Sequence, residues 1–241
     1  MILLYPNAFD CFMEHNVYKQ YEKHYVAVDC VIFGYEKEEL LVLLYPRGFE
    51  PSRGKWSLLG GFVNQDETLG DAARRVLYTT TGLVHNFQEQ VHAFSRIDRD
   101  PAGRVISVAY YALIRINQQD TDLVREHGAH WWPVSKLPDL IFDHREMIDN
   151  ALRKLQRRAG SEIIGRELLG ERFTLSNLKK LYEAIFQREI DAGNFRKKVL
   201  SLGVLHNTGV KDKSESKKGA YLYQYQQEMA DQLNLLPILK R

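Results

Sequence analysis

Residues 61–83 read GFVNQDETLGDAARRVLYTTTGL, and this stretch decides the fold. Its apolar spacing predicts a helix over residues 66–79, and Gly82 stands where that helix would end, because glycine tolerates the left-handed backbone of a helix C-terminus. Just before it, KWSLLGGFV at 55–63 predicts a short strand that ends in a pair of glycines. The side chains at helical spacing are Ala72, Ala73, Val76 and Leu77.

The flanking segments place this strand and helix in a larger sheet. Alternating, β-branched residues at 25–35 and the apolar run at 40–45 predict a hairpin, and residues 91–116 predict a second hairpin with DPAG in its loop. Residues 143–158 predict an amphipathic helix. Its apolar side consists of Met147, Ile148, Ala151, Leu152 and Leu155. The sequence therefore predicts an α+β domain with a mixed sheet, ending near residue 159.

A second pattern begins after three glycines in the segment 159–172, AGSEIIGRELLGER. We expect the domain boundary there, giving domains 1–159 and 160–241. Thr174 and Asp191 are predicted N-caps of two short helices, since their oxygens can accept hydrogen bonds from the first helical N–H groups. Strand, basic loop and strand follow. This order is that of a winged helix-turn-helix.

Composition bounds the function only loosely. The 241 residues carry a formal net charge of +2, but residues 1–159 hold 19 Lys and Arg against 21 Asp and Glu, whereas residues 160–241 hold 14 against 10. The basic tail suggests nucleic acid as a partner, with a solvated surface as the alternative. Cys11 and Cys30 fit no disulfide framework or metal site. The longest apolar run, at 40–45, is too short to span a membrane, so we expect a cytoplasmic protein.

Residues 61–83 resemble the Nudix box, whose pattern is Gly, five residues, Glu, seven residues, Arg-Glu, an aliphatic residue, any residue, Glu-Glu, any residue, Gly and an aliphatic residue. The strand before it is also similar, with Leu59 where Pro is usual, and the resemblance spans about residues 22–158. It implies an α/β/α sandwich around a ligand cleft. The positions that hold are Gly61, Glu67, Arg75, Leu77, Gly82 and Leu83.

Three carboxylates of that box are missing. Where the family has glutamates that hold divalent cations, this chain has Val76, Thr79 and Thr80. These positions share one helix face, and neutral hydroxyls or a hydrocarbon replace the charge that a hard cation requires. We therefore expect a non-catalytic domain with no metal site and no cofactor, in which Arg75 and Glu67 still pair.

Residues 171–205, ERFTLSNLKKLYEAIFQREIDAGNFRKKVLSLGVL, resemble the DNA-binding domain of Nudix-related transcriptional regulators, the NrtR-like family. RVISVAYYAL and FDHREMIDNAL also resemble its members. Within the family the chain is most similar to the arabinose-responsive AraR branch of Bacteroides-type bacteria, whereas other members sense ADP-ribose and control NAD metabolism. The resemblance implies a homodimeric repressor of sugar-utilisation genes, with arabinose as effector and double-stranded operator DNA as partner.

The second helix of the tail carries the candidate base-reading residues. With Phe195, Val199 and Leu202 toward the core, a rotation of about 100° per residue puts Lys197 on the exposed side. Asn can bond adenine edges, and Arg and Lys can reach guanine or phosphate. The alternative is a solvated amphipathic helix. The predicted DNA-binding residues are Asn194, Arg196, Lys197 and Ser201 on the helix, and Lys211, Lys213, Lys217 and Lys218 in the wing loop.

Candidate ligand-binding residues are Asp29, Lys55, Trp56 and Arg104. Asp29 interrupts an apolar strand and needs a partner, which is either a ligand or local donors. Lys55 and Trp56 precede the glycine pair, although Trp56 could be core and Arg104 a surface charge. His144 is expected to make hydrogen bonds at a helix start rather than to act as a base.

Three hypotheses follow. The leading one is a ligand-responsive repressor with a non-catalytic Nudix-like sensor and arabinose as effector. The alternatives are a regulator of NAD metabolism that senses ADP-ribose, and a metal-dependent Nudix hydrolase of ADP-ribose-like nucleotides fused to a nucleic-acid tether. The missing carboxylates disfavour the hydrolase.

Overall fold

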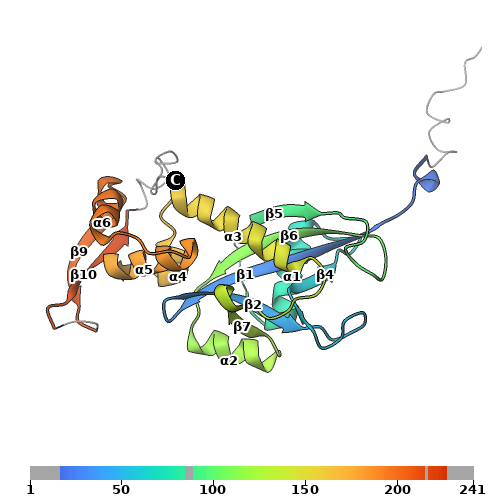
Figure 1. Cartoon of the computed structure of the whole chain (residues 1–241), viewed down its shortest axis with the longest axis horizontal. Helices are drawn as coiled ribbons and strands as arrows, with labels where there is room; N and C mark the ends of the chain where they lie inside the picture. The colour runs from blue at the N-terminus through green and yellow to red at the C-terminus, as the bar shows by residue number, and fades with distance from the viewer. Residues whose placement is uncertain (1–16, 85–88, 215–216, 227–241) are drawn as a thin grey trace, which may run out of the picture.

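In the computed structural model, two units follow one another along the chain, and the structure describes residues 17–84, 89–214 and 217–226. A mixed sheet flanked by helices comes first (Figure 1). A smaller unit of helices and a three-stranded sheet lies beyond one end of it (Figure 1). Cys11 falls outside the described residues.

The larger sheet runs in the order β3-β2-β1-β6-β5, with β4 also paired to β1 and β7 to β2. The pair β1–β6 is parallel and the other pairs are antiparallel, which confirms the expected mixed sheet and both hairpins. The elements of this unit are η2 (Val17–Gln20), β1 (Tyr25–Glu36), β2 (Glu39–Pro46), β3 (Trp56–Ser57), β4 (Leu59–Phe62), α1 (Leu69–Thr81), β5 (Glu89–Phe94), β6 (Val105–Ile114), α2 (Gln118–Glu126), β7 (His130–Pro133), η3 (Val134–Lys136) and α3 (His144–Ser161).

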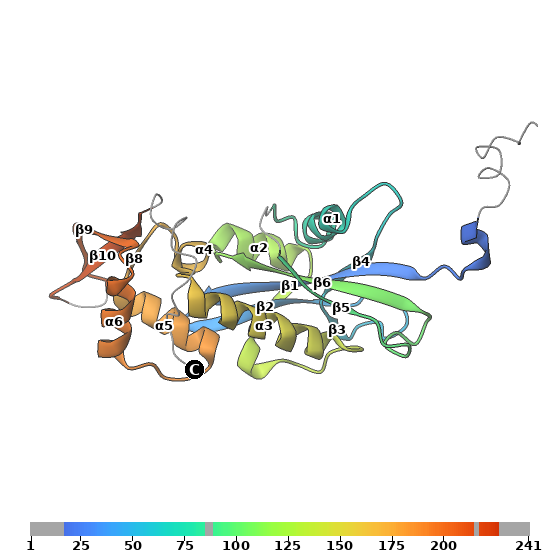
Figure 2. The same ribbon diagram turned by 90° about the horizontal axis from the view of Figure 1, so that it is seen from above.

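The sheet is the middle of three layers. Helices α1 and α2 lie on one side of it and α3 lies on the other (Figure 2). Successive side chains of β1 point to opposite faces of the sheet and are buried on both. Cys30 and Ile32 pack with α1, whereas Val31 and Phe33 pack with α3. Asp29 has the same parity as Val31 and therefore belongs to the α3 face. This placement brings it toward the first residue of α3.

Helix α1 has a capping box at its N-terminus and a glycine in the left-handed conformation at its C-terminus. Thr68 and Asp71 form a reciprocal capping box, which satisfies two backbone N–H groups at the helix start. Gly82 ends the helix with a φ of 73°, and a Cβ there would crowd Leu123. The expected helix at 66–79 is confirmed, although the cap shifts its start to Leu69.

Helix α3 is longer than the sequence pattern indicates. It continues to Ser161, where the Glu162 N–H donates to the Arg158 carbonyl. The expected boundary between residues 159 and 160 therefore falls within its last turn. The helical hydrogen bonds continue past Gly160, and a Cβ built at this position would meet nothing within 4 Å, so the helix does not require glycine there.

The smaller unit has the expected order of helix, turn, helix and hairpin. Thr174 and Asp191 cap its two main helices, accepting hydrogen bonds from Asn177 N and Asn194 N. Strand β8 is an addition, and it pairs with β10 to complete a sheet in the order β8-β10-β9. The elements are α4 (Gly165–Leu169), β8 (Arg172–Thr174), α5 (Leu175–Phe186), α6 (Ala192–Ser201), β9 (Leu205–Asp212) and β10 (Ala220–Tyr225).

The two units share packed side chains and polar contacts. One apolar core runs from Phe33 in the sheet through Leu155 of α3 to Leu178 and Phe195 in the smaller unit. Across the same junction, the Gln156 amide donates to the Ile185 carbonyl at 2.9 Å. In the part of the chain that the structure describes, no helix has the length and apolarity needed to cross a bilayer.

Candidate functional site

A cavity of about 160 Å³ opens between β1, β4 and the start of α3. Its closed end is polar and buried, and its mouth carries exposed aromatic rings. The glycine pair after β3 forms part of its wall. A Cβ at Gly60 would collide with Asp29 Oδ1, so only glycine leaves room for that carboxylate. Its lining residues are Ala27, Asp29, Tyr45, Arg47, Gly48, Phe49, Ser57, Leu58, Leu59, Gly60, Gly61, Phe62, Thr80, Arg99, Asp100, Val105, Phe142 and His144.

The closed end is built around a buried guanidinium. Arg99 donates from Nε and Nη2 to the two carboxylate oxygens of Asp143, at 2.9 and 2.8 Å. The same Nη2 lies 3.6 Å from Asp29 Oδ2, which also accepts a 2.5 Å hydrogen bond from Ser107. Burial of these charges is tolerated because each has an opposite charge beside it. Asp29 thus has local donors, as one of the two sequence interpretations expected.

His144 forms the wall opposite Asp29. Its Nδ1 accepts a hydrogen bond from the Leu58 N–H at 3.0 Å, as expected of a helix-start residue rather than a base. Its Nε2 lies 3.7 Å from Asp29 Oδ1. Burial lowers the pKa of His144, and the nearby carboxylates of Asp29 and Asp143 offset this only in part. The ring is therefore neutral at physiological pH.

The mouth of the cavity offers a cation and two aromatic faces. The Arg47 guanidinium lies 4.0 Å from the ring centre of Phe49 and 5.2 Å from that of Phe142. Among the described residues Arg47 has no carboxylate within ion-pair distance. Phe49 and Phe62 line the opening and are 59% and 50% exposed. The Nε of Arg47 donates to the Phe49 carbonyl at 3.2 Å. Exposed aromatic rings beside a guanidinium that no carboxylate neutralises suit a planar, anionic ligand.

The four predicted ligand-binding residues are not brought together. Asp29 lines the cavity, but Lys55 is exposed in the loop before β3 and Trp56 packs its ring edge-on against Trp132 and His130. Arg104 donates to the Ser95 and Arg96 carbonyls at 2.7 and 3.1 Å, tying its own hairpin together. Lys55, Trp56 and Arg104 are not among the residues that line the cavity.

Sequence reasoning missed the buried pair Arg99 and Asp143. Arg99 lies in a loop of Asp, Pro and Gly residues, where an arginine is ordinarily solvated, and Asp143 precedes α3 as a helix cap would. In the structure the Asp143 side chain makes no cap hydrogen bond and turns to Arg99 instead. Only the long-range fold brings the two together, so no local pattern signals them.

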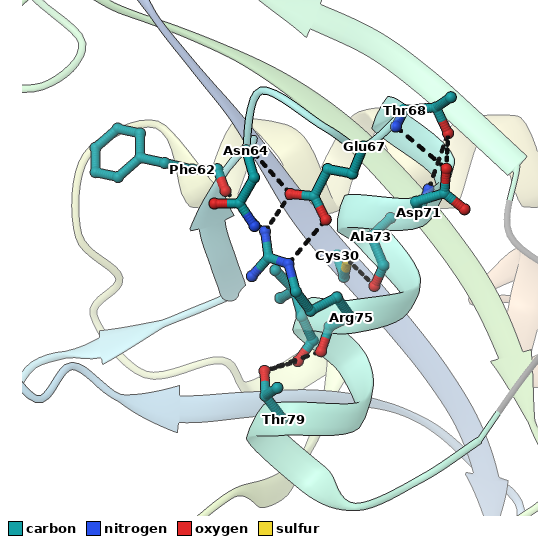
Figure 3. Close-up of polar contacts among 10 residues, drawn as sticks. Cys30, Phe62, Asn64, Glu67, Thr68, Asp71, Ala73, Arg75 and Thr79 are labelled. Atoms are coloured by element: carbon teal, nitrogen blue, oxygen red, sulfur yellow. Dashed lines mark hydrogen bonds and ion pairs between the residues drawn. The ribbon is translucent and has the colours of Figure 1, made fainter.

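The Nudix-like loop before α1 is held by an ion pair, as expected. Arg75 donates from Nε and Nη2 to Glu67 at 2.9 and 2.6 Å, and Nη2 also reaches the Phe62 carbonyl (Figure 3). Glu67 further accepts from the Asn64 N–H at 2.7 Å (Figure 3). These bonds lower the pKa of Glu67, so it stays ionised and committed to the loop.

The three positions that lack carboxylates differ in their surroundings. Val76 is buried against Gly61 in the core beneath α1. The Thr79 hydroxyl donates back to the Arg75 carbonyl at 2.9 Å (Figure 3), and half-buried Thr80 lines the cavity. Across residues 17–84, 89–214 and 217–226, no group of three His, Cys, Asp or Glu side chains is arranged to hold a metal ion.

The candidate nucleic-acid interface lies on α6 and the wing. Phe195 and Val199 are buried, so α6 turns the opposite side outward as predicted. The wing differs from the prediction at one residue: Lys211 belongs to β9, where its ammonium lies 4.8 Å from the ring centre of Tyr221, and is not in the loop. The exposed residues of this interface are Asn194, Arg196, Lys197, Ser201, Lys211, Lys213, Lys217 and Lys218.

Cys30 is the described cysteine, and it is buried beneath α1 with its thiol directed to the Ala73 carbonyl at 3.6 Å (Figure 3). Burial raises the pKa of the Cys30 thiol well above its ordinary range. It is thus a plain core thiol, as expected, and takes no part in the site.

Two family models match the chain. A model of the NUDIX domain matches residues 23–151, and a model of the NrtR DNA-binding winged helix domain matches residues 165–225. The first covers the sheet, the residues that line the cavity and the N-terminal part of α3, up to residue 151. The second covers α4 through β10.

Individual proteins agree with these models. A relative from Acinetobacter baylyi, described as an ADPR responsive transcriptional repressor, is 30% identical over 209 residues, covering 85% of this chain and 83% of the relative. An ADP-ribose pyrophosphatase from Methanocaldococcus jannaschii is 34% identical over 137 residues, covering 56% of this chain and 78% of the enzyme.

Solved structures of NrtR from Shewanella oneidensis match at 30% identity. The crystal structure with a 27mer DNA has a TM-score of 0.76, covering 89% of this chain and 99% of that one. The structure of its Nudix domain with ADP ribose has a TM-score of 0.52, covering 61% and 98%. Because the matches extend over both units, the chain belongs to the NrtR-like family of Nudix-related transcriptional regulators.

Proposed function

We propose that this chain is a homodimeric transcriptional repressor that releases its operator when ADP-ribose binds in the cavity of the Nudix domain. The observation that carries the proposal is the similarity across both units to a repressor that responds to ADPR and to a regulator whose Nudix domain was crystallised with ADP ribose. The expectation of arabinose finds no support among these relatives, so ADP-ribose takes its place as the leading effector.

The chemistry at the mouth of the cavity supports a nucleotide. Phe49 and Phe62 are exposed where they could stack on an adenine ring, an interaction that contributes about 1–3 kcal/mol per base. Arg47 lines the same cavity beside Phe49 and Phe142, where its guanidinium could bind the diphosphate. A guanidinium binds phosphate oxygens through two parallel N–H donors, which a lysine cannot do.

A free pentose is the second candidate for the effector, because the cavity is small. The cavity volume of about 160 Å³ is below the roughly 300–1,000 Å³ typical of sites for drug-sized ligands. A monosaccharide would fill the closed end alone, whereas ADP-ribose must lie partly in the open mouth. L-arabinose therefore belongs in the same binding test.

We infer that the domain binds its ligand without hydrolysing it. Val76, Thr79 and Thr80 supply no carboxylate to the α1 face, and Glu67 is already paired with Arg75. The Nudix-box resemblance implies that hydrolysis depends on divalent cations held by such carboxylates, which neutralise phosphate oxygens and activate water. With Mg²⁺ or Mn²⁺ present, ADP-ribose should remain intact. Turnover that a chelator abolishes, in preparations free of contaminating hydrolase, would favour the enzyme.

One experiment tests the repressor and its effector together. Duplexes that bind the protein are selected from a randomised pool, and fluorescence anisotropy of a selected duplex is followed during titration with ADP-ribose, ADP or L-arabinose. ADP-ribose should weaken DNA binding and raise the melting temperature, with about 2.7 kcal/mol of stabilisation at a concentration of one hundred times its Kd. If DNA binding and melting temperature respond to L-arabinose and not to ADP-ribose, the effector is a free pentose.

Paired variants locate the effector. Arg47→Ala removes the guanidinium at the mouth, whereas Arg53→Ala removes an exposed one from the same loop that does not line the cavity. The first should weaken ADP-ribose binding about tenfold or more, as expected for a lost charge-assisted bond, and the second should not. Equal effects of both would mean that the diphosphate does not bind at the mouth.

A further inference from the structure

Two buried polar atoms face each other across the closed end of the cavity. Asp29 Oδ1 and His144 Nε2 are 3.7 Å apart, and their side chains are only 8% and 4% exposed. That distance is too long for a hydrogen bond. Neither atom has a hydrogen-bond partner among the described residues, although Asp29 Oδ2 and His144 Nδ1 do.

The hydrogen-bonding roles of both atoms are fixed by their neighbours. Because Nδ1 of His144 accepts from the Leu58 N–H, the proton of the neutral ring is on Nε2, which makes Nε2 a donor. Ser107 and Arg99 hold Asp29 through Oδ2, so Oδ1 remains an acceptor, and it lies beside Gly60 and His144 in the cavity lining. A donor and an acceptor therefore flank one small space.

A hydroxyl group fits this arrangement, since it accepts one hydrogen bond and donates another. An ammonium has no acceptor for the His144 N–H, and a carbonyl has no donor for Asp29. A metal ion fits poorly, because the Arg99 guanidinium already lies between the carboxylates of Asp29 and Asp143.

We propose that the closed end of the cavity recognises a sugar hydroxyl, with Asp29 accepting its hydrogen bond and His144 donating to its oxygen. The inference rests on the proposed function, because it assigns part of the effector to the same cavity. The terminal ribose of ADP-ribose and a free pentose share this chemistry. The sugar would lie innermost, and in ADP-ribose the diphosphate and adenine would extend toward Arg47 and the aromatic mouth.

Two conservative substitutions test the pair separately. Asp29→Asn keeps the shape but replaces one acceptor oxygen by an amide that donates. His144→Asn places an oxygen where Nδ1 was, so that the Leu58 N–H keeps its partner, and removes the Nε2 donor. The matched controls are Asp98→Asn and His92→Asn, which alter exposed residues that do not line the cavity.

Calorimetric titration of the full chain with ADP-ribose, ADP, D-ribose and L-arabinose gives the readout. Each test variant should lose about 10- to 100-fold in affinity for the sugar-bearing ligand that binds, as expected for one charge-assisted hydrogen bond. ADP, which lacks the terminal ribose, should bind all variants alike. The controls should bind every ligand as the parent does.

The outcomes separate this inference from the choice of effector. If a pentose binds and ADP-ribose does not, and the variants still lose affinity, the hydroxyl site stands and the ADP-ribose proposal fails. If ADP-ribose binds both variants as tightly as the parent, or ADP loses the same factor, the hydroxyl site is wrong and the ADP-ribose proposal stands. Failure of every sugar-bearing probe to bind the parent overturns both.

Monodeoxy analogues provide a test that does not depend on variant folding. On the parent protein, the analogue lacking the recognised hydroxyl should bind about 10- to 100-fold more weakly than the complete sugar ligand. That analogue should bind Asp29→Asn and the parent with similar affinity, because the lost partners are the same. A series in which no single hydroxyl matters would contradict the assignment.

Discussion

The wall of the cavity holds three buried charged side chains that lie close to one another. Arg99, Asp143 and Asp29 are each less than a tenth exposed, and Asp143 forgoes the capping of its own helix to pair with Arg99. An uncapped helix start costs about 1 kcal/mol. The ion pair instead fixes the hairpin loop against α3, so that the side chains facing the ligand are already in position.

We expect the pair Arg99–Asp143 to be strongly coupled. Asp143→Ala should lower the free energy of unfolding by about 3–5 kcal/mol, because it leaves a buried guanidinium without its main partner. The double variant Arg99→Met/Asp143→Leu should cost much less than the sum of the single changes. Urea unfolding measures both. Arg96→Ala, at an exposed position, is the control and should change stability by less than about 0.5 kcal/mol.

Acid should weaken the fold through His144. Its folded pKa lies below the ordinary value of 6.5, so on acidification the unfolded chain takes up a proton that the folded chain does not. Stability should thus fall as pH drops below about 6.5, by up to about 1.4 kcal/mol per pH unit for one proton. The groups facing the ring are Asp29, Asp143, Arg99 and Arg47.

The check is a series of unfolding measurements between pH 5 and pH 8. His144→Asn should flatten the slope below pH 6.5, whereas His92→Asn, at an exposed position of β5, should leave it as in the parent. An unchanged slope in His144→Asn would show that other groups produce the acid sensitivity.

At the scale of elements, substitutions in α6 and substitutions in the wing should weaken DNA binding in different ways. Lys217 and Lys218 lie in the wing loop and suit phosphates, whereas Asn194 and Arg196 lie on the exposed side of α6. Replacing both lysines by alanine should weaken binding to all duplexes alike and lower the salt slope by about 0.9 per lost phosphate contact. Replacing Asn194 or Arg196 should cost about 1–3 kcal/mol at one base position per half-site, if it makes a bidentate contact.

Titrations against selected and scrambled duplexes at several salt concentrations distinguish these effects. Selected DNA sites should be pseudo-palindromic, because a two-fold symmetric dimer presents two copies of α6. The centres of the two half-sites should lie about one or two turns of the DNA helix apart. Helix variants that keep the affinity and selectivity of the parent would mean that α6 does not read bases.

Apolar patterns in the sequence predict several of the larger elements. They locate the helices α1, α3, α5 and α6, because each buries one stripe of side chains, and both hairpins, whose apolar strands are separated by polar loops. They miss β8, which has only three residues and is a strand because β10 pairs with it. They also end α3 at residue 158, whereas the helix continues through Gly160 to Ser161.

The candidate site is less accessible to sequence reasoning than the fold. Asp29 is conspicuous because a carboxylate interrupts an apolar strand. Arg99 sits in a loop with no periodicity, and its burial depends on Asp143, 44 positions away. Lys55 and Arg104 have suitable charges near the cleft in sequence, yet the backbone directs them elsewhere.

On the scale of the whole molecule, the two units are joined by one apolar core. Leu178 of α5 is fully buried in the same cluster as Phe33 of β1 and Leu155 of α3. An ion pair of 2.7 Å between Lys180 and Glu38 adds a contact at the rim. Because the core is continuous, loss of packing in one unit should destabilise the other.

The three tryptophans, Trp56, Trp131 and Trp132, all lie in the first unit and therefore report its unfolding. Leu178→Ala, in the second unit, should lower the free energy of unfolding by about 2–5 kcal/mol. The tryptophan fluorescence transition and the circular dichroism transition should shift together. Leu200→Ala, at an exposed position of α6, is the control and should leave both in place. A fluorescence transition that does not move in Leu178→Ala would mean that the units unfold independently.

Helix α3 has a consequence for anyone who would exchange the DNA-reading unit between relatives. It is 18 residues long, or about 27 Å, with His144 in the cavity wall at its first position and Gln156 and Arg158 bonded to the second unit near its last. One inserted residue would turn those two ends by about 100° relative to each other. In a chimera, α3 comes from one parent and therefore meets one foreign unit, so its contacts with that unit are lost. A working exchange must join the two parents after Ser161. It must also keep, in the new DNA-binding unit, the residues that contact Gln156 and Arg158.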